Sequence, residues 1–366
     1  MPEFRSKFLE LYYGRYLRPA KDYLVATLES TLPLASYFPG AYNWMMGNPA
    51  LQKLMRAKVG LVDSPKLSGI RLSEAIRERG IAWATPSQLA ALPASQREKA
   101  VIVVQDAFTS FFETQLVLDV IDLLRILGFV PLLAPFMPNG KPLQVHGFLN
   151  AFRRVARKNA TSLRKIESEH VPLVGIDPSM TLTYRFEYAK ALEEDAVPKV
   201  RLLQEWLAQQ RDHLMGFARR AQSRHFRLAP HCTERTTAAH SVKDWQSVFG
   251  ALGYSLDVVN AGCCGMAGTY GHEAANAETS HKIYSLSWAN VVGDAVNDNA
   301  LLATGYSCRS QVKRMSNRRL QHPAQALLAA MRSSPTGVAD QRAVVESRSR
   351  SSSDYRTHSI SHGCCD

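Results

Sequence analysis

AVIVVQDAFTSFFETQLVLDVIDLLRILGFVPLLA, residues 100–134, predicts a strand, a helix and a second strand in immediate succession. Its first part, Ala100–Gln105, is rich in β-branched residues, which is typical of a strand buried on both faces of a parallel sheet. Glu113–Leu127 has the periodicity of an amphipathic helix that ends at Gly128, and Phe129–Ala134 is a second apolar run. This order of elements indicates an α/β fold with a parallel sheet.

The alternation continues downstream and then repeats. A helix over Leu149–Ile166 and a strand over Val171–Ile176 complete a first doubly wound unit. The second set comprises the strand Phe226–Pro230, the helix Ser241–Leu252, the strand Tyr254–Asn260, the helix His272–Gly293 and the strand Ala300–Thr304. We therefore predict two copies of one α/β unit.

The spacing of turn residues supports this duplication. Asp106 lies 22 residues before Gly128, and Cys232 lies 21 residues before Gly253. The strings LGFVPLLAPFMPNGKP and LGYSLDVVNAGCCGMA occupy matching places in the two sets. Matched glycines and turns at a fixed period are the signature of an internal repeat.

The remaining segments complete the predicted domain organisation. Residues 1–99 form an N-terminal helical arm, and Ser333–Asp366, with the run SRSRSSSDYR and few apolar residues, is predicted to be disordered. We predict five segments: a helical arm (1–99), a first repeat without cysteines (100–183), a helical connector (184–225), a second repeat with a cysteine site (226–332) and a tail (333–366).

Composition excludes several classes of protein. With 46% hydrophobic and 21% charged residues among 366, the chain has ordinary globular composition, and six cysteines are too few for a disulfide scaffold. The net charge of +12 is spread over both ends of the chain without a nucleic-acid-binding motif, so we expect no nucleic acid partner. No apolar run predicts a transmembrane segment or a secretory signal, and we expect a cytoplasmic protein; peripheral contact with a membrane stays open.

Four cysteines follow three successive strands of the second set. Cys232 follows the first strand, Cys263 and Cys264 follow the second, and Cys308 follows the third. Because ligands of open α/β sheets bind beyond the carboxyl ends of the strands, we expect these thiols to share one site. Cys364 and Cys365 belong to the predicted tail and are considered incidental.

Thiolates in this arrangement favour a metal. Adjacent cysteines are poorly placed to form a disulfide with each other, since neighbouring Cα atoms lie about 3.8 Å apart. The pair Cys263–Cys264 is flanked by Gly262 and Gly265, which allow a sharp turn and close approach of the backbone to a cofactor. Four thiolates suit either zinc or an iron–sulfur cluster, and His231 or His272 could complete the ligand set. The alternative is that these are inert buried cysteines.

These motifs resemble a known family. NAGCCGMAGTYGHE, preceded by HCTERT and followed by LLATGYSCRSQVKR and HPAQALL, resembles the cysteine-rich or CCG domain over roughly residues 1–330. This domain occurs in one subunit of heterodisulfide reductase and in the iron–sulfur subunit of glycolate oxidase. The resemblance is strongest to the C-terminal region of large FAD-linked D-2-hydroxyacid dehydrogenases of the D-2-hydroxyglutarate dehydrogenase type.

The resemblance implies an iron–sulfur-associated electron-transfer component, 4Fe-4S in type, of an FAD-linked oxidoreductase. Its motif cysteines are Cys232, Cys263, Cys264 and Cys308, and its partners would be a flavin-containing domain or subunit and a ferredoxin-like module. FAD is expected only on a domain or partner outside this chain. The chain would thus be part of an enzyme without carrying the flavin catalytic domain, and its own catalytic residues are unknown.

Two departures from the family pattern are informative. The usual C-x-x-C ending is incomplete, because Gln311 follows Cys308 by three residues where a second cysteine is expected. In the first copy, Asp106, Met137 and Met180 stand near the places of the cysteines, so this copy is predicted to bind no cluster. Two alternative functions remain: a zinc-stabilised structural or interaction module without a redox role, and an inactive fragment of a split gene. Substrate, electron acceptor and oligomeric state are not determined by the sequence.

Overall fold

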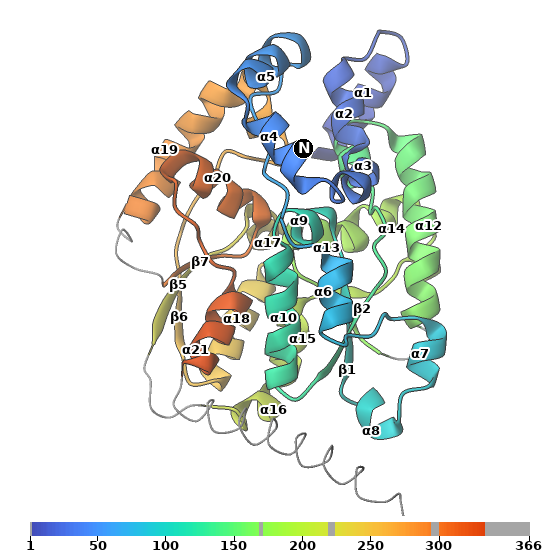
Figure 1. Cartoon of the computed structure of the whole chain (residues 1–366), viewed down its shortest axis with the longest axis vertical. Coiled ribbons are helices and arrows are strands. Elements are labelled where there is room, and N and C mark those ends of the chain that lie inside the picture. The colour runs from blue at the N-terminus through green and yellow to red at the C-terminus, as the bar shows by residue number, and fades with distance from the viewer. Residues whose placement is uncertain (1, 168–170, 219–223, 294–299, 334–366) are drawn as a thin grey trace, which may run out of the picture.

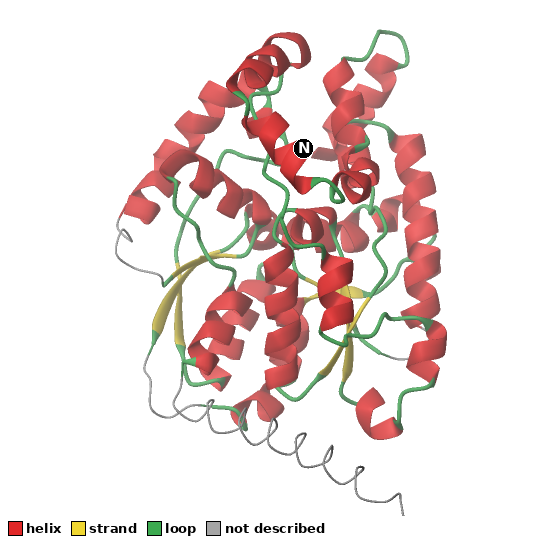
Figure 2. Ribbon diagram, in the orientation of Figure 1, coloured by secondary structure: helices red, strands yellow, loops and turns green. Residues whose placement is uncertain are grey.

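The computed structural model describes residues 2–167, 171–218, 224–293 and 300–333. Two parallel β-sheets, each covered by helices, form the body, and a group of helices from the N-terminal part lies across one end (Figures 1 and 2). The predicted α/β class is therefore confirmed. The predicted disordered tail lies outside the described residues.

The N-terminal part consists of short helices, as the sequence predicts. The second and third helices meet at Thr27, whose hydroxyl donates to the carbonyl of Tyr23 at 2.8 Å. The elements are α1 (Pro2–Tyr13), α2 (Ala20–Ala26), α3 (Leu28–Ala35), α4 (Pro39–Gly47), α5 (Pro49–Leu54), the π-helical turn η1 (Met55–Val59), α6 (Leu72–Glu78), α7 (Pro86–Ala90) and α8 (Ala94–Arg97).

The first sheet has the strand order β2-β1-β3-β4, and all its pairs are parallel. Its central strand β1 is buried along its whole length, as its β-branched sequence predicts. Its elements are β1 (Ala100–Val104), α9 (Ala107–Phe111), α10 (Thr114–Ile126), β2 (Val130–Leu133), α11 (Lys141–Val145), α12 (Leu149–Glu167), β3 (Leu173–Gly175), α13 (Pro178–Phe186), α14 (Tyr188–Ala191), η2 (Glu194–Ala196), β4 (Val200–Leu202), α15 (Leu203–Gln209) and α16 (Arg211–Met215).

The second sheet has the order β6-β5-β7 and is also entirely parallel. In each sheet the first strand is central, the second strand lies on one side and the third lies on the other. The elements are β5 (His225–Ala229), α17 (Cys232–Thr237), α18 (His240–Ala251), β6 (Ser255–Val258), the 3-10 turns η3 (Tyr270–His272) and η4 (Ala274–Asn276), α19 (Ala277–Gly293), β7 (Leu301–Ala303), α20 (Tyr306–Ser316) and α21 (Pro323–Arg332).

The fourth strand is the one element of the first sheet without a counterpart. Val200–Leu202 pairs with Leu173–Gly175. It lies in residues 184–225, which were predicted to be a helical connector. Three residues are too few to show a strand periodicity, and the pairing depends on the neighbouring strand. The predicted domain limits themselves stay a prediction.

Helices shared between the two sheets unite the copies. The crossover helix α10 of the first copy packs on α21 of the second, and the crossover helix α18 of the second packs on α15 of the first. Side chains from these four helices belong to one buried apolar cluster, which includes Trp206 and Trp245. Each copy thus packs its crossover helix on a helix of the other copy, and burial of apolar surface holds the two copies in a fixed relative position.

Candidate functional site

All four cysteines of the described residues lie beyond the carboxyl ends of the second sheet. Cys232 is the first residue of α17, which follows β5, and Cys308 is the third residue of α20, which follows β7. Cys263 and Cys264 belong to the loop that leads from β6 to η3. The parallel strands end at one edge, and the chain turns there into α17 and α20, which lie at that end of the sheet in Figure 1.

The structure brings the four thiols into one row. Neighbouring thiols interact in sequence, Cys232 with Cys263, Cys263 with Cys264 and Cys264 with Cys308, and Cys232 also interacts electrostatically with Cys308. Hydrogen bonds from the neighbouring thiols of Cys232 and Cys264 lower the pKa of Cys263, and the same contacts raise the pKa of these two neighbours. Cys263 is exposed and Cys264 and Cys308 are buried, so the row extends from the surface inward.

The row differs from the ligand shell of a single ion. In the part of the chain that the structure describes, no three His, Cys, Asp or Glu side chains form a group that could hold one metal ion. Tetrahedral zinc requires ligands that converge on one point.

Glycines shape the loop that carries the cysteine pair. Gly265 has a φ of +85°, and a Cβ at this position would lie 2.3 Å from the carbonyl oxygen of Ser280. No other residue type fits there without moving α19. Helix α19 also holds the loop through Trp288, whose indole N–H donates to the carbonyl of Gly262 at 2.9 Å. Gly265 is therefore required by close packing of the loop on α19, whereas a side chain at Gly262 would meet only the hydroxyl of Ser287, at 3.1 Å.

A backbone amide donates to the exposed sulfur: the amide of Gly265 lies 3.4 Å from Sγ of Cys263. The backbone amides of Thr233 and Met266 lower the pKa of Cys232 and Cys264, against the larger effects of the neighbouring thiols and of burial, which raise it. Such donors stabilise negative charge on sulfur and tune a sulfur-ligated centre.

His231, a candidate ligand from the sequence, has both ring nitrogens engaged. Nδ1 accepts from the amide of Thr233 at 3.2 Å, as the cap of α17, and Nε2 lies 3.0 Å from the hydroxyl of Ser307. Burial lowers the pKa of His231, which favours the neutral ring. Its position in the structure is that of a link between the starts of α17 and α20, which bear Cys232 and Cys308.

His272, the second candidate, is paired with the N-terminal arm. Its Nδ1 lies 2.5 Å from Asp63, which also binds Arg314 at 2.9 Å. The adjacent Glu273 forms an ion pair with Lys21 at 2.5 Å. A short backbone pairing between Leu61 and Glu273 completes the contact. The arm therefore clamps the end of the loop that carries the cysteine pair.

Glu234 was not singled out by the sequence analysis, yet it lies at the centre of a buried network beneath the site. Its carboxylate accepts from Thr304 at 2.5 Å, Gln204 at 2.8 Å and Ser241 at 3.2 Å. Burial raises the pKa of Glu234 to about 7. A carboxylate within a TERT sequence gives no local sign of this role, because its partners come from three other segments.

Two contacts join the site to the first copy. Arg309, next to Cys308, is buried and forms an ion pair with Glu113 at the start of α10. The backbone amide of Tyr306 donates to Asp177 at 2.7 Å. The helix that carries Cys308 is thus anchored on the strand ends of the other sheet.

The first copy places different chemistry at the corresponding strand ends. Asp106 caps α9 by accepting from the amides of Phe108 and Thr109, and Asp177 caps α13. Burial raises the pKa of Asp106 to about 7. Met180 is buried in α13, one turn beyond the cap. These residues satisfy local backbone groups and form no row of donors.

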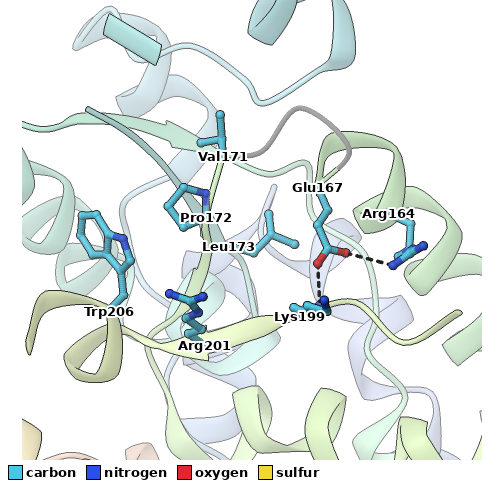
Figure 3. Close-up of a pocket in the computed structure, with 8 residues that line it drawn as sticks. All are labelled: Arg164, Glu167, Val171, Pro172, Leu173, Lys199, Arg201 and Trp206. Carbon is cyan, nitrogen blue, oxygen red and sulfur yellow. Dashed lines mark hydrogen bonds and ion pairs between the residues drawn. The ribbon is translucent and has the colours of Figure 1, made fainter. Parts of the chain in front are cut away.

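A pocket of about 540 Å³ lies elsewhere. It is lined by Trp206, Arg201, Lys199 and other residues at the amino ends of β3 and β4 (Figure 3). Parallel strands place this end opposite to the cysteines. Glu167 occupies its rim and accepts from the amide of Lys199 at 3.1 Å. We therefore assign the candidate site to the cysteine edge and not to this pocket.

Comparison with known proteins agrees with the resemblance inferred from the motifs. No protein-family model matches the chain. D-2-hydroxyglutarate dehydrogenase of Pseudomonas putida is 48% identical over 328 residues, which cover 90% of this chain and 32% of that protein. The enzyme of the same name from Escherichia coli K12 is 45% identical over 329 residues, with the same coverage. One subunit of the anaerobic glycerol-3-phosphate dehydrogenase of E. coli K12 is 24% identical over 248 residues, 65% of this chain and 60% of that protein.

The chain spans about a third of the length of the D-2-hydroxyglutarate dehydrogenases it matches. None of the described helices is both long and apolar enough to cross a membrane. The chain that carries the cysteine row and the two α/β units is thus similar, over nine-tenths of its own length, to bacterial D-2-hydroxyglutarate dehydrogenases. The matched region makes up about one third of the length of each of these enzymes.

Proposed function

We propose that this chain is the electron-transfer part of an FAD-linked D-2-hydroxyacid dehydrogenase and binds an iron–sulfur cluster at Cys232, Cys263, Cys264 and Cys308. The observation that carries the proposal is the group of four interacting thiols at one sheet edge, with the backbone amide of Gly265 donating to the sulfur of Cys263. The relatives named D-2-hydroxyglutarate dehydrogenase support the reaction class, and the match to one subunit of another dehydrogenase supports a multi-part enzyme.

Four cysteine thiols can hold either an iron–sulfur cluster or a zinc ion, and the proposal takes the cluster. Each iron of a cluster takes its own protein ligand, so the ligands need not converge on one point. A zinc ion needs four donors at about 2–2.3 Å from its centre. When bound, a cluster supplies one-electron transfer at a potential that hydrogen bonds to its sulfurs adjust.

Gln311 gives a second indication that the site is built around a bound group. It lies one helical turn after Cys308, is fully buried, and donates through Nε2 to Ser280 at 3.0 Å. Its Oε1 is buried without a hydrogen-bond partner. Buried polar atoms are almost always paired, so an orphaned oxygen beside the cysteine loop suits a site completed by a further group.

The residues of this chain would position the thiols and limit access of water. Gly262 and Gly265 allow the loop to turn, Trp288 fixes it, and His231 joins the starts of the two cysteine-bearing helices. The flavin would be bound by a domain or subunit outside this chain, because the sequence contains no dinucleotide-binding glycine fingerprint after a strand. There, oxidation of the 2-hydroxyacid to a 2-oxoacid would release two electrons and two protons, with the flavin accepting the hydride.

Metal analysis tests the proposal. The chain is purified without oxygen, and iron, acid-labile sulfide and zinc are measured per chain together with the visible and electron paramagnetic resonance spectra. We expect iron and sulfide in similar amounts, and loss of both in Cys263→Ser and Cys264→Ser, since a hydroxyl replaces a soft thiolate poorly. Cys364→Ser makes the same chemical change outside the described residues and should retain the wild-type content.

Two results would overturn the proposal. One is zinc in a 1:1 ratio to the chain without sulfide, which would favour the structural-module alternative. The other is unchanged iron in both loop variants, which would place the iron elsewhere in the chain.

A further inference from the structure

Exposed apolar side chains are concentrated in the N-terminal arm. Of the 18 large hydrophobic side chains that are exposed in the described residues, 14 lie between Phe4 and Leu54. Single exposed apolar residues are ordinary on a protein surface, but a concentration of this kind marks an interaction surface.

Helix α1 and the turn after it carry the most continuous part of this surface. Residues four apart in a helix share a face, and the rings of Phe8 and Tyr12 stack with centroids 5.7 Å apart, followed by Tyr12 and Tyr16 at 4.6 Å. Leu17 is 99% exposed and Phe4 is 74% exposed. We call this set the arm face; it consists of Phe4, Phe8, Leu11, Tyr12, Tyr16 and Leu17.

A second group of exposed apolar residues lies on α3 and α4 and includes Leu34, Phe38 and Trp44. In Figures 1 and 2, α1 and α2 form one projection and α4 and α5 form another. Both projections lie at the end of the molecule where α17 and α20 begin. The two projections therefore lie at the same end of the molecule as the cysteine edge of the second sheet.

The inner side of the arm is fixed to the site. Lys21 is paired with Glu273, and Asp63 with His272, at the end of the cysteine loop. His146, from the first copy, lies between Asp22 at 3.2 Å and Thr269 at 3.3 Å. A partner bound to the outer side of the arm would therefore be held at a fixed position relative to the thiols.

The charge of the arm indicates the chemistry of the partner. Residues 1–60 contain eight Lys and Arg residues and four Asp and Glu residues. Two of these four acids, Asp22 and Glu29, are buried. Among the bases, the Arg18 side chain is buried and Lys21 is paired with Glu273, which leaves six basic and two acidic groups on the arm. The arm is thus apolar with an excess of basic groups, and it is complementary to an apolar surface with an acidic rim.

We propose that the arm face binds the flavin-bearing part of the dehydrogenase, a protein surface with an apolar centre and an acidic rim. The identity of the partner rests on the proposed function. About two thirds of the length of the curated relatives lies outside the matched region. In those enzymes this additional protein needs a surface on the matched region to contact. The arm face combines the required apolar area with proximity to the cysteine loop.

Oxidative footprinting tests the proposal on proteins as they exist. Hydroxyl radicals label exposed side chains of this chain and of the intact P. putida relative, and labelling is compared at the arm face and at the aligned residues. We expect labelling to fall by about fivefold or more in the intact relative, because burial removes these side chains from solvent. Leu286, which is 79% exposed and lies on α19, and Met215 are the internal controls and should be labelled alike in both proteins.

A binding measurement complements the footprint. The part of the P. putida relative that lies outside the matched region, here called the remainder, is produced with its flavin. It is titrated with this chain, with the triple variant F4E/F8E/Y12E and with the control variant Leu286→Glu. We expect the triple variant to weaken binding at least about tenfold, as the loss of a buried aromatic cluster does at other interfaces, and the control to bind normally. If the remainder loses its flavin when produced alone, the footprint decides.

Three results would overturn the docking proposal: equal labelling of the arm face in both proteins, binding to anionic vesicles that the triple variant abolishes, or self-association of this chain that the triple variant abolishes. None of these measurements depends on iron. Protection of the arm face with no iron in the chain would refute the proposed function alone, and iron without protection would refute the docking proposal alone.

Discussion

The two copies have the same strand order but opposite chemistry at their strand ends. In the second copy, three strand ends present thiols around a glycine-rich loop. In the first copy, Asp106 and Asp177 cap helices, and Glu29 of α3 inserts from the arm to accept from the amide of Gly140 at 2.7 Å. The difference teaches that topology determines where a site lies, whereas the local side chains determine whether that place becomes a site or a closed junction.

The largest effect is expected from the loop that distinguishes the second copy. Gly265→Ala should reduce the free energy of unfolding by roughly 4 kcal/mol, about 1 from the left-handed backbone and up to about 3 from overpacking against Ser280. Gly268→Ala is the matched control: its φ is +70°, but nothing lies within 4 Å of the new Cβ. It should lose only about 1 kcal/mol. Urea denaturation of the two variants measures the difference, and equal losses would show that Gly265 is not packed as described.

The junction of the first copy should respond to pH. Burial raises the pKa of Glu29 to about 7 from an ordinary value of 4.5, and its Oε1 has no hydrogen-bond partner. The folded state therefore favours the neutral acid, so the stability that Glu29 contributes is full below pH 4.5 and is lost as pH rises to about 7. Glu29→Gln should remove about 2–3 kcal/mol of this pH dependence.

Unfolding free energy measured at pH 5 and pH 8 tests this expectation. Asp106 and Glu234 also have a raised pKa of about 7, so only the difference between wild type and Glu29→Gln is attributed to Glu29. An identical pH profile for the two proteins would show that the Glu29 carboxyl is not buried in its neutral form.

A smaller effect is expected at the ion pair that joins the copies. Glu113→Gln leaves the buried guanidinium of Arg309 without its charged partner, while the carbonyls of Ala303 and Thr304 still accept from it. We expect a loss of about 1–2 kcal/mol in thermal or urea unfolding, less than for a fully buried pair because Glu113 is partly exposed. Glu278→Gln, which breaks the exposed pair with Lys282, should change stability by less than about 0.5 kcal/mol.

The smallest effect tests whether topology alone can create a site. Met180→Cys adds a thiol to the first copy at a position that corresponds to Cys308, where the spacing from the preceding glycine is 52 residues against 55. Its neighbours Asp106 and Asp177 supply no thiol, so the iron content of the chain should not rise. An additional equivalent of iron and sulfide in this variant would show that the first copy is already close to a functional site.

Much of the fold could be predicted because its signals are local. The apolar run of β1, the glycines that end α10 and α18, and the placement of four cysteines after strands are all visible within short windows. The site followed from the same windows, since consecutive parallel strands necessarily end at one edge of a sheet.

Three features depended on residues far apart in the chain. Strand β4 needs β3 beside it, Arg309 needs Glu113, and the roles of His272 and Glu273 became clear only from their pairing with Asp63 and Lys21 in the arm. A lone histidine after a cysteine motif suggests a ligand, and only its neighbours show that it holds the arm.

Local composition and periodicity therefore determined the α/β class, the duplication and the candidate cysteines, because hydrophobic burial and strand alternation act over a few residues. The tertiary structure decided which polar residues are paired, which thiols touch and which apolar side chains remain exposed on the arm. These properties arise from long-range packing, in which charges and donors find partners across more than a hundred residues of chain, as Glu29 and Gly140 do.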